Sequence, residues 1–219
     1  MGTAGLTLAD NLAYERALHD QGLQLIAGVD EVGRGALAGP LVSAAVVLPP
    51  LEQIAVDWDF WAMVRDSKVV QPRERAELAA AIEHRARSVG IAAVDPEEID
   101  AIGLTAANRS AMERAILALD VEPEMLLIDA LTIDSGIPQI GIVDGDAISL
   151  AIAAASIVAK VTRDAIMVRH DPTYPVYGFA GHKGYGVPGH LAALREHGPC
   201  RLHRRSFAPV RAMVSHATP

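Results

Sequence analysis

Two adjacent acids stand at the end of an apolar stretch near the N-terminus, and a glycine-rich turn follows them directly. The stretch reads LQLIAGVDEVGRG, with Asp30 and Glu31 as the acids and Gly33, Arg34 and Gly35 as the turn. Glycine leaves backbone N–H groups open to close approach, and the guanidinium of Arg34 is suited to a phosphate. The pattern indicates carboxylate chemistry beside a sugar-phosphate backbone.

Two further acids, Asp129 and Asp146, also stand where apolar runs stop, after EMLLI and IGIVDG. In α/β proteins, functional groups gather at strand ends near the centre of the sheet. Carboxylates brought together there repel one another unless a cation shares them, and an all-oxygen set favours Mg²⁺ or Mn²⁺ over zinc. Two such ions about 4 Å apart can stabilise the attacking and leaving oxygens of a phosphodiester displacement.

Taken singly, each acid has a simpler interpretation as a helix cap or a solvated strand end. This interpretation is strongest for Asp146, because a long alanine-rich helix is expected after it, over residues 147–169. It is also the interpretation preferred for Asp134, Asp144 and Asp164. The four-acid hypothesis therefore depends on the glycine-rich turn beside the first pair.

A nucleotide-cofactor enzyme is an alternative, because Gly33, Gly35 and Ala38 satisfy a loose dinucleotide-binding fingerprint. That fingerprint opens a helix, whereas strand-like residues follow this turn, and two adjacent acids would repel a pyrophosphate. A non-catalytic nucleic-acid-binding protein is a second alternative. Such a protein would be expected to have lost one of the four acids, and none is lost.

Length and composition favour one sizeable aliphatic core. The chain has 219 residues, of which 51% are hydrophobic but only 4% aromatic. A single cysteine, Cys200, excludes an internal disulfide and fits a reducing cytoplasm. The N-terminus does not resemble a secretory signal, and the most apolar run, residues 147–159, is too short to cross a membrane. No segment signals assembly, so a monomer without membrane association is expected.

The charge is unevenly distributed along the chain. The net charge is −8, but residues 1–150 hold 10 Lys and Arg against 24 Asp and Glu, whereas residues 151–219 hold 9 against 3. The C-terminal third is therefore basic on an acidic protein, which is the charge pattern of a polyanion-binding surface. Random surface charge is the plainer explanation, and charge alone does not decide between them.

Hydrophobic periodicity predicts an α/β fold. Helices are expected at 7–20, 71–88, 95–119 with a break near Gly103, 147–169 and 190–198; strands at 23–30, 41–48, 89–94, 124–129 and 139–144. The first two strands form, most simply, a hairpin. Residues 1–170 are predicted to form one layered α/β core, and residues 171–219 a C-terminal extension that packs on it and contacts substrate.

Six sequence blocks together resemble the bacterial type 2 ribonucleases H (ribonuclease HII). They are AGVDEVGRGALAGPLVSAAVVL, DSK at 66–68, LLIDA, GDAISLAIAAASIVAKVTRDAIM, YGFAGHKGYG and HRRSFAPV. The blocks span nearly the whole chain in order, which makes a chance match implausible.

The resemblance implies a ribonuclease H-like fold: a mixed five-stranded sheet with helices on both faces and a C-terminal helical extension. It maps the family's catalytic and metal-binding acids onto Asp30, Glu31, Asp129 and Asp146. It also implies cleavage of RNA in RNA/DNA hybrids, and nicking of duplex DNA 5′ of a single embedded ribonucleotide, as in ribonucleotide excision repair. The products would carry a 3′-hydroxyl and a 5′-phosphate, and the cofactor would be two Mg²⁺ or Mn²⁺ ions.

Discrimination of RNA from DNA requires a partner for the 2′-hydroxyl. In the resembled family this is the Gly33-Arg34-Gly35 loop together with a tyrosine, here Tyr185. An aromatic ring stacked on the next sugar favours deoxyribose, so the pair is expected to read an RNA-to-DNA junction. An ordinary half-buried loop tyrosine is the alternative.

Further polar residues are candidates for contact with the substrate backbone, although each is also compatible with a solvated surface position. They are Lys68, Ser156, Lys160, Lys183, Arg204 and Arg205. Lys160 has a second possible partner in Asp164, four residues later. His182 and His203 are candidates for protonation or phosphate binding, and equally for loop structure.

Adjacent strand residues point to opposite faces, so Asp30 and Glu31 cannot both aim side chains at one ion unless the strand ends there. Otherwise Glu31 would contribute its carbonyl oxygen or a water-mediated contact, with Asp30 as the bridging ligand. Two positions depart from the family pattern: Ala130 stands where glycine is usual, and Asp144 where lysine is frequent. Neither changes the four acids.

Overall fold

The centre of the molecule is a mixed five-stranded sheet. The computed structural model describes residues 10–65, 67 and 70–214. In spatial order the strands are β3 (Ser88–Val94), β2 (Leu41–Val47), β1 (Ile26–Val32), β4 (Met125–Asp129) and β5 (Gln139–Ile142). β1 pairs antiparallel with β2, and β2 with β3, whereas β4 runs parallel to β1 and β5. The sheet expected from the resemblance is confirmed, and so is the hairpin of its first two strands.

Most helices lie where the sequence predicts them. The helical elements of the described part are η1 (Asp10–Leu12), α1 (Ala13–His19), α2 (Leu51–Val56), α3 (Trp58–Trp61), α4 (Pro72–Arg85), α5 (Pro96–Ile102), α6 (Leu104–Leu117), α7 (Gly145–Ile148), α8 (Leu150–His170), η2 (Asp171–Thr173), α9 (Phe179–His182), α10 (Pro188–His197) and α11 (Ala208–Val214). The predicted break between α5 and α6 falls at Gly103, whose φ of +83° favours glycine. None of these helices is long and apolar enough to cross a membrane.

The long helix begins later than predicted. A separate turn, α7, precedes it, and α8 starts at Leu150 rather than at residue 147. Its cap is Ser149, whose hydroxyl accepts a hydrogen bond from the backbone N–H of Ile152 at 3.2 Å. The simpler interpretation of Asp146 as the cap of this helix is therefore wrong.

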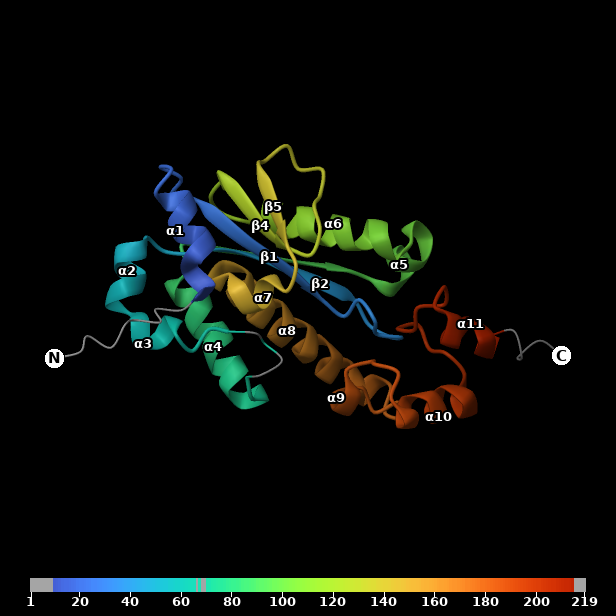
Figure 1. Cartoon of the computed structure of the whole chain (residues 1–219). Coiled ribbons are helices and arrows are strands. Elements are labelled where there is room, and N and C mark those ends of the chain that lie inside the picture. Colours follow the sequence, from blue (N-terminus) through green and yellow to red (C-terminus); the bar gives the residue numbers. More distant parts are fainter. Residues whose placement is uncertain (1–9, 66, 68–69, 215–219) are drawn as a thin grey trace.

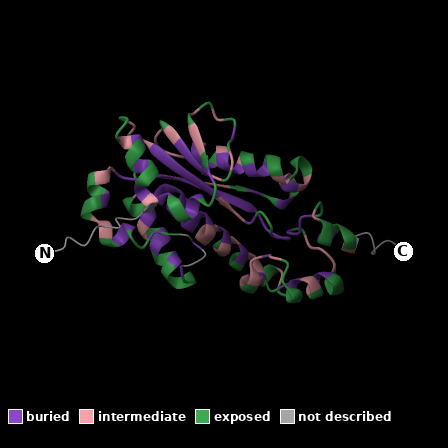
Figure 2. Cartoon of the chain, in the orientation of Figure 1, coloured by how far each residue is buried: buried purple, intermediate pink, exposed green. Residues whose placement is uncertain are grey.

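Helices cover both faces of the sheet, as Figure 1 shows. α8 and α4 pack on one face and α6 on the other. The strands β1 and β2 between them are almost entirely buried, whereas β3 and β5 are buried only in part (Figure 2). The approach of α8 to β1 is very close, since a Cβ added at Gly28 would lie 2.0 Å from the carbonyl carbon of Ala151. Small side chains on both elements allow this contact, which explains a core rich in alanine and poor in aromatic residues.

The C-terminal helices lie at the end of α8 away from α1 (Figure 1). The loop of residues 33–40, between β1 and β2, joins them to the sheet. Within that loop, Ala38 forms an antiparallel bridge with His203, and the N–H of Gly39 donates to the carbonyl of Leu202 at 2.8 Å. The N–H of Leu37 donates to the carbonyl of Gly184 at 2.9 Å. The C-terminal segment is thus hydrogen-bonded directly to the glycine-rich loop.

A buried glutamate in α1 fixes the start of α8. One oxygen of Glu15, Oε1, accepts hydrogen bonds from the hydroxyl of Ser149 at 2.7 Å and from the N–H of Ala151 at 3.0 Å. Glu15 is only 2% exposed, and burial raises the pKa of its carboxyl. This contact joins the N-terminal helix to the segment that carries Asp146.

We predict that Glu15→Ala lowers the free energy of unfolding by about 2 kcal/mol, because it leaves two buried donors without an acceptor. Glu15→Gln keeps an acceptor oxygen at this place and is expected to lose clearly less. Urea denaturation of the three proteins measures the difference. Equal stability of the alanine variant and the unchanged protein would contradict this role.

Candidate active site

Asp30 lies within β1 with its side chain between the strand and α8. The residue is 6% exposed. Its carboxylate accepts a hydrogen bond from the N–H of Glu31 at 2.7 Å and interacts with the hydroxyl of Ser156 on α8. Its backbone carbonyl accepts from the hydroxyl of Ser43 at 2.7 Å. The Glu31 N–H and the Ser156 hydroxyl therefore hold the carboxylate in one orientation, and Ser43 holds the backbone behind it.

Burial raises the pKa of Asp30 well above its ordinary value, and the negative charges of Glu31 and Asp129 raise it further. The hydrogen bonds from Ser156 and from the backbone act in the opposite direction but do not compensate. The charged form of Asp30 is thus disfavoured by its surroundings. A group with this combination of burial and like charges is typical of a functional site.

Glu31 leaves the opposite face of the strand. Because β1 continues to Val32, the strand does not end between the two acids, and their side chains diverge. Glu31 faces α6, where the side chain of Asn108 lies near its carboxylate. Burial raises the pKa of Glu31, while the guanidinium of Arg34, 3.8 Å away, lowers it. The strand would have to end at Asp30 for both carboxylates to point at one ion, and it does not.

Asp129 and the segment that carries Asp146 lie side by side. Asp129 ends β4, and its Oδ1 accepts a hydrogen bond at 2.8 Å from the N–H of Gly145, which begins α7. A Cβ at Gly145 would lie 3.2 Å from that oxygen and 2.6 Å from Cδ1 of Ile152, so glycine permits the contact. The next residue, Asp146, is 6% exposed.

Asp129 also shares a sheet face with Asp30. Leu127, two residues before Asp129, packs against Ile152 of α8, so the side chain of Asp129 projects toward the same helix. Its charge acts on both Asp30 and Glu31. The structure therefore brings Asp129 and Asp146 to the end of β4 that lies beside Asp30 of β1. This end of the two strands, with its three aspartates, is called the acidic edge.

The donor chemistry of this edge fits a hard divalent cation. Carboxylates that repel one another and are partly shielded from water gain from a shared positive charge, and oxygen ligands suit Mg²⁺ and Mn²⁺. Among the described residues, no three His, Cys, Asp or Glu side chains already stand in a metal-binding arrangement.

The glycine-rich loop is shaped by a buried arginine that the sequence analysis did not single out. Gly33 has a φ of +91°, and a Cβ there would lie 2.0 Å from Nε of Arg163. Arg163, on α8, donates from Nε to the carbonyl of Pro40 at 2.9 Å and from Nη2 to that of Ala38 at 3.1 Å. No local pattern reveals such a residue, because its acceptors lie more than 100 positions earlier in the chain.

Arg204 supports the same loop from the C-terminal side. It is fully buried and donates to the carbonyl of Gly39 at 3.0 Å and to that of Arg34 at 3.1 Å. Its pKa falls to about 9, through burial first and then repulsion by Arg163. Direct phosphate contact by Arg204 stays a prediction, whereas the contacts present hold the loop.

Tyr185 lies beside two cations of α8. Nζ of Lys160 is 5.8 Å from the centre of its ring, and Cζ of Arg163 is 5.2 Å away. Lys160 also pairs with Asp164 at 2.8 Å, which confirms the second partner expected from the spacing. Ser156 is buried near Asp30, with its hydroxyl 2.9 Å from that of Ser67.

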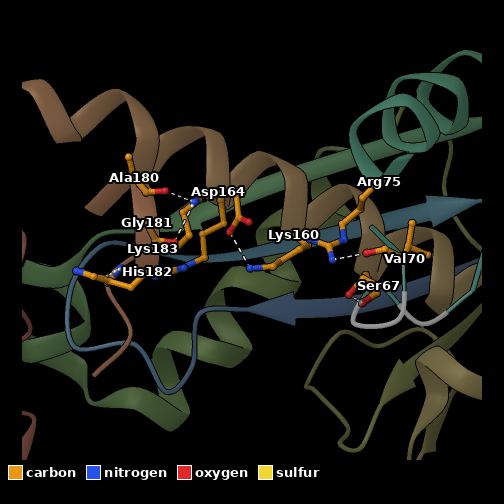
Figure 3. A network of polar contacts seen from close by, with 12 residues as sticks. Ser67, Val70, Arg75, Lys160, Asp164, Ala180, Gly181, His182 and Lys183 are labelled. Carbon is orange, nitrogen blue, oxygen red and sulfur yellow. Dashed lines mark hydrogen bonds and ion pairs between the residues drawn. The ribbon is translucent and has the colours of Figure 1, made fainter. Parts of the chain in front are cut away.

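A groove of about 550 Å³ opens next to Tyr185, between α4, α8 and the α9 segment. Figure 3 shows polar residues that line it: Arg75 from α4, Lys160 and Asp164 from α8, and Lys183 from the turn after α9. Lys183 has a φ of +54° and donates to the carbonyl of Ala180. The groove therefore presents positive charge on several sides.

The remaining predicted residues lie apart from this groove or cannot be placed. Arg205 is exposed, and its backbone N–H donates to Asp100 at 2.7 Å. Lys68 lies outside the described residues. Ala130 has a φ of +57°, a conformation that explains why glycine is usual there, and Asp144 adopts a similar φ of +55°.

The fold and the acidic edge define a ribonuclease H-like α/β protein, and comparisons with known proteins identify the family. The family model of ribonuclease HII matches residues 27–210. A ribonuclease HII of Dehalococcoides mccartyi strain BAV1 is 48% identical over 203 residues, which cover 92% of this chain and 94% of the relative. That of Geobacillus thermodenitrificans is 48% identical over 91% of this chain and 74% of its own length.

Solved structures agree. Ribonuclease H2 of Pyrococcus horikoshii superposes with a TM-score of 0.75 at 26% identity, covering 87% of this chain and 97% of its own. Ribonuclease HII of Archaeoglobus fulgidus, solved in complex with PCNA, gives a TM-score of 0.70 at 25% identity over 84% and 95%. The chain belongs to the ribonuclease HII family and is an endoribonuclease that acts on nucleic acid.

We predict that Gly33→Ala destabilises the protein by about 2 kcal/mol or more, since it combines an unfavourable φ with a clash against Arg163. Gly35→Ala is the matched control two residues away, because a Cβ there meets no atom within 4 Å. It is expected to change stability by less than about 1 kcal/mol. Thermal and urea denaturation compare the two, and equal losses would refute the specific role of Gly33.

Proposed function

We propose that this protein hydrolyses RNA in RNA/DNA hybrids and nicks duplex DNA 5′ of a single embedded ribonucleotide, leaving a 3′-hydroxyl and a 5′-phosphate. Membership of the ribonuclease HII family supports the ribonuclease H activity. The observation that carries the site assignment is the meeting of Asp30, Asp129 and the Asp146 segment on the α8 side of one sheet edge.

We assign Asp30, Asp129 and Asp146 as the side-chain ligands of Mg²⁺ or Mn²⁺. Glu31, whose side chain leaves the other face, would contribute its carbonyl oxygen or a water-mediated contact. When bound, two such ions supply positive charge to the attacking and leaving oxygens of the phosphodiester. A ribonuclease HIII from Bst, which shares the fold at a TM-score of 0.69 and 20% identity, was solved in complex with Mn²⁺.

The chain's own residues orient this chemistry. The hydroxyl of Ser156 and the N–H of Glu31 fix the direction of the Asp30 carboxylate, which would be the bridging ligand. The hydrogen bond from the N–H of Gly145 fixes the position of one carboxylate oxygen of Asp129. Burial of the edge limits access of bulk water and strengthens the electrostatic interactions there.

Substrate recognition would combine the glycine-rich loop with Tyr185. The backbone N–H groups of Gly33, Arg34 and Gly35 are suited to the 2′-hydroxyl side of the ribonucleotide, and the exposed Arg34 side chain to a phosphate. The ring of Tyr185 would stack on the following deoxyribose. The hydrogen bond from Leu37 to Gly184 joins the loop to the tyrosine segment, so the two contacts move as one unit.

The cationic groove beside Tyr185 would carry the phosphates of the bound duplex. Lys160 and Lys183 line it, and Arg75 adds a third positive charge that the sequence analysis did not consider. Such contacts give affinity and salt dependence without sequence preference. Arg205 would add a contact outside the groove, and Lys68 is proposed as a further phosphate contact.

Asp30→Asn is expected to reduce Mg²⁺-dependent cleavage by more than about 100-fold, because the amide removes the shared negative charge. Binding of the same hybrid, measured by fluorescence anisotropy, should remain within a few-fold of the unchanged protein. Asp134→Asn, at an exposed acid away from the site, is the control and should cleave normally. Substantial cleavage by the Asp30 variant would refute the assignment.

Tyr185→Ala is expected to lower nicking at a lone ribonucleotide by about tenfold or more, because stacking on an aromatic ring is worth about 1–3 kcal/mol. Cleavage of a continuous RNA/DNA hybrid should fall less. The measurement is the selectivity ratio, defined as kcat/KM at a lone ribonucleotide divided by kcat/KM on the hybrid. An unchanged ratio would count against junction reading.

A further inference from the structure

A chain of buried histidines lies directly behind Tyr185. His190, in the first turn of α10, and His203 are 0% and 1% exposed. Their Nε2 atoms lie 3.0 Å apart, and Nδ1 of His190 lies 2.9 Å from the carbonyl oxygen of Tyr185. Of the two interpretations of His203 from the sequence, a loop histidine with its hydrogen bonds satisfied fits a ring enclosed in this way.

The positions of the ring protons on His203 and His190 follow from one hydrogen bond. The backbone N–H of Cys200 donates to Nδ1 of His203 at 3.0 Å, so the ring proton of a neutral His203 is on Nε2. That proton is donated to Nε2 of His190, which places the proton of His190 on Nδ1. Nδ1–H of His190 then donates to the carbonyl of Tyr185. Each ring has one donor and one acceptor, and both are used.

The neutral state of both rings agrees with their surroundings. Burial and the neighbouring His190 lower the pKa of His203 to about 4, and burial lowers the pKa of His190. A proton added to Nε2 of His190 would place two N–H donors against each other in the pair, and one added to Nδ1 of His203 would oppose the N–H of Cys200. The direction of the hydrogen bonds is therefore fixed at neutral pH.

A third histidine, His182, holds the other side of the tyrosine. Its ring stacks on His190 with centroids 4.4 Å apart, and its carbonyl accepts the N–H of Tyr185 at 3.0 Å. Its Nδ1 accepts from the N–H of Gly184 at 3.1 Å, and Nε2 then donates to the carbonyl of Tyr177 at 2.7 Å. Both peptide groups that flank Tyr185 are thus held by the histidine cluster.

We propose that His190, oriented by His203, is a positioning residue that sets the backbone of Tyr185 and thereby the protein's preference for RNA-to-DNA junctions. The inference rests on the proposed function of Tyr185. The hydrogen bond from Nδ1 of His190 to the Tyr185 carbonyl, rather than the bulk of the imidazole, sets this preference. Plain core packing is the competing explanation, since Phe179 also contacts these rings.

Two substitutions at one position separate the explanations. His190→Asn places an amide nitrogen near the position of Nδ1 and keeps a donor for Tyr185, whereas His190→Gln places its amide near Nε2 and keeps only the contact to His203. Both lose the ring, so both are expected to lower Tm by similar amounts. We expect the selectivity ratio to fall about fivefold for the glutamine variant and less than about twofold for the asparagine variant.

Leu194→Ala is the matched control for general loosening of α10. Leu194 lies one turn after His190, is fully buried and packs on Leu37 and Val210 rather than on the tyrosine segment. It should lower Tm and leave the selectivity ratio unchanged. Equal loss of the ratio in the asparagine and glutamine variants, or a loss in the Leu194 variant, would overturn the positioning role.

The result with Tyr185→Ala separates failure of the positioning role of His190 from failure of junction reading by Tyr185. If that variant changes the ratio and His190→Gln does not, the positioning role alone is overturned. If Tyr185→Ala leaves the ratio unchanged, junction reading fails and the inference fails with it. Should the His190 variants not fold, long-range ¹H–¹⁵N correlation on the unchanged protein at pH 7 provides the test: the Nε2–H tautomer is expected for His203 and Nδ1–H for His190, and any other pair overturns the inference.

Discussion

Burial of the Asp30 carboxylate between β1 and α8 is the constraint on which the rest of the site depends. The helix can cover this acid only because Gly28 lets it approach the strand, with the Ala151 backbone where a side chain would otherwise stand. The same approach brings Ser156 against the carboxylate and Asp146, at the start of the helical segment, to the sheet edge. A buried acid with acidic neighbours is costly to ionise, and a shared divalent cation offsets that cost.

The second constraint is the support of the glycine-rich loop. Arg163 and Arg204 approach it from α8 and from the C-terminal segment, and each gives its donors to loop carbonyls rather than to carboxylates. The two guanidiniums repel each other, and the carbonyl oxygens that accept their hydrogen bonds stabilise each of them. Through the Gly184 carbonyl, the same loop is bonded to the segment of Tyr185. The glycine-rich loop and the segment of Tyr185 are thereby parts of one hydrogen-bonded framework.

The sheet was predictable because its strands are continuous apolar runs bounded by turn residues, and Gly103 and Pro72 marked helix ends at the correct places. The four acids could be singled out because they interrupt those runs, and their role as metal ligands stays a prediction. The supporting residues were not: Glu15 and Arg163 bind groups more than 100 positions away in the chain, and His190 pairs with a histidine 13 positions away. Such contacts leave no local pattern. The same limit explains why Asp146 was open to interpretation as a cap, a role that Ser149 fills.

The central claim is that Asp30, Asp129 and Asp146, rather than the Glu31 carboxylate, hold the cations. A crystal structure of the Mn²⁺-loaded protein, with manganese located by anomalous scattering, tests it most directly. We expect at least one manganese peak within about 2.0–2.3 Å of carboxylate oxygens of both Asp30 and Asp129, with the Glu31 carboxylate still on the α6 side of the strand. Manganese bound by the Glu31 carboxylate without Asp30, or no manganese at this edge, would contradict the account.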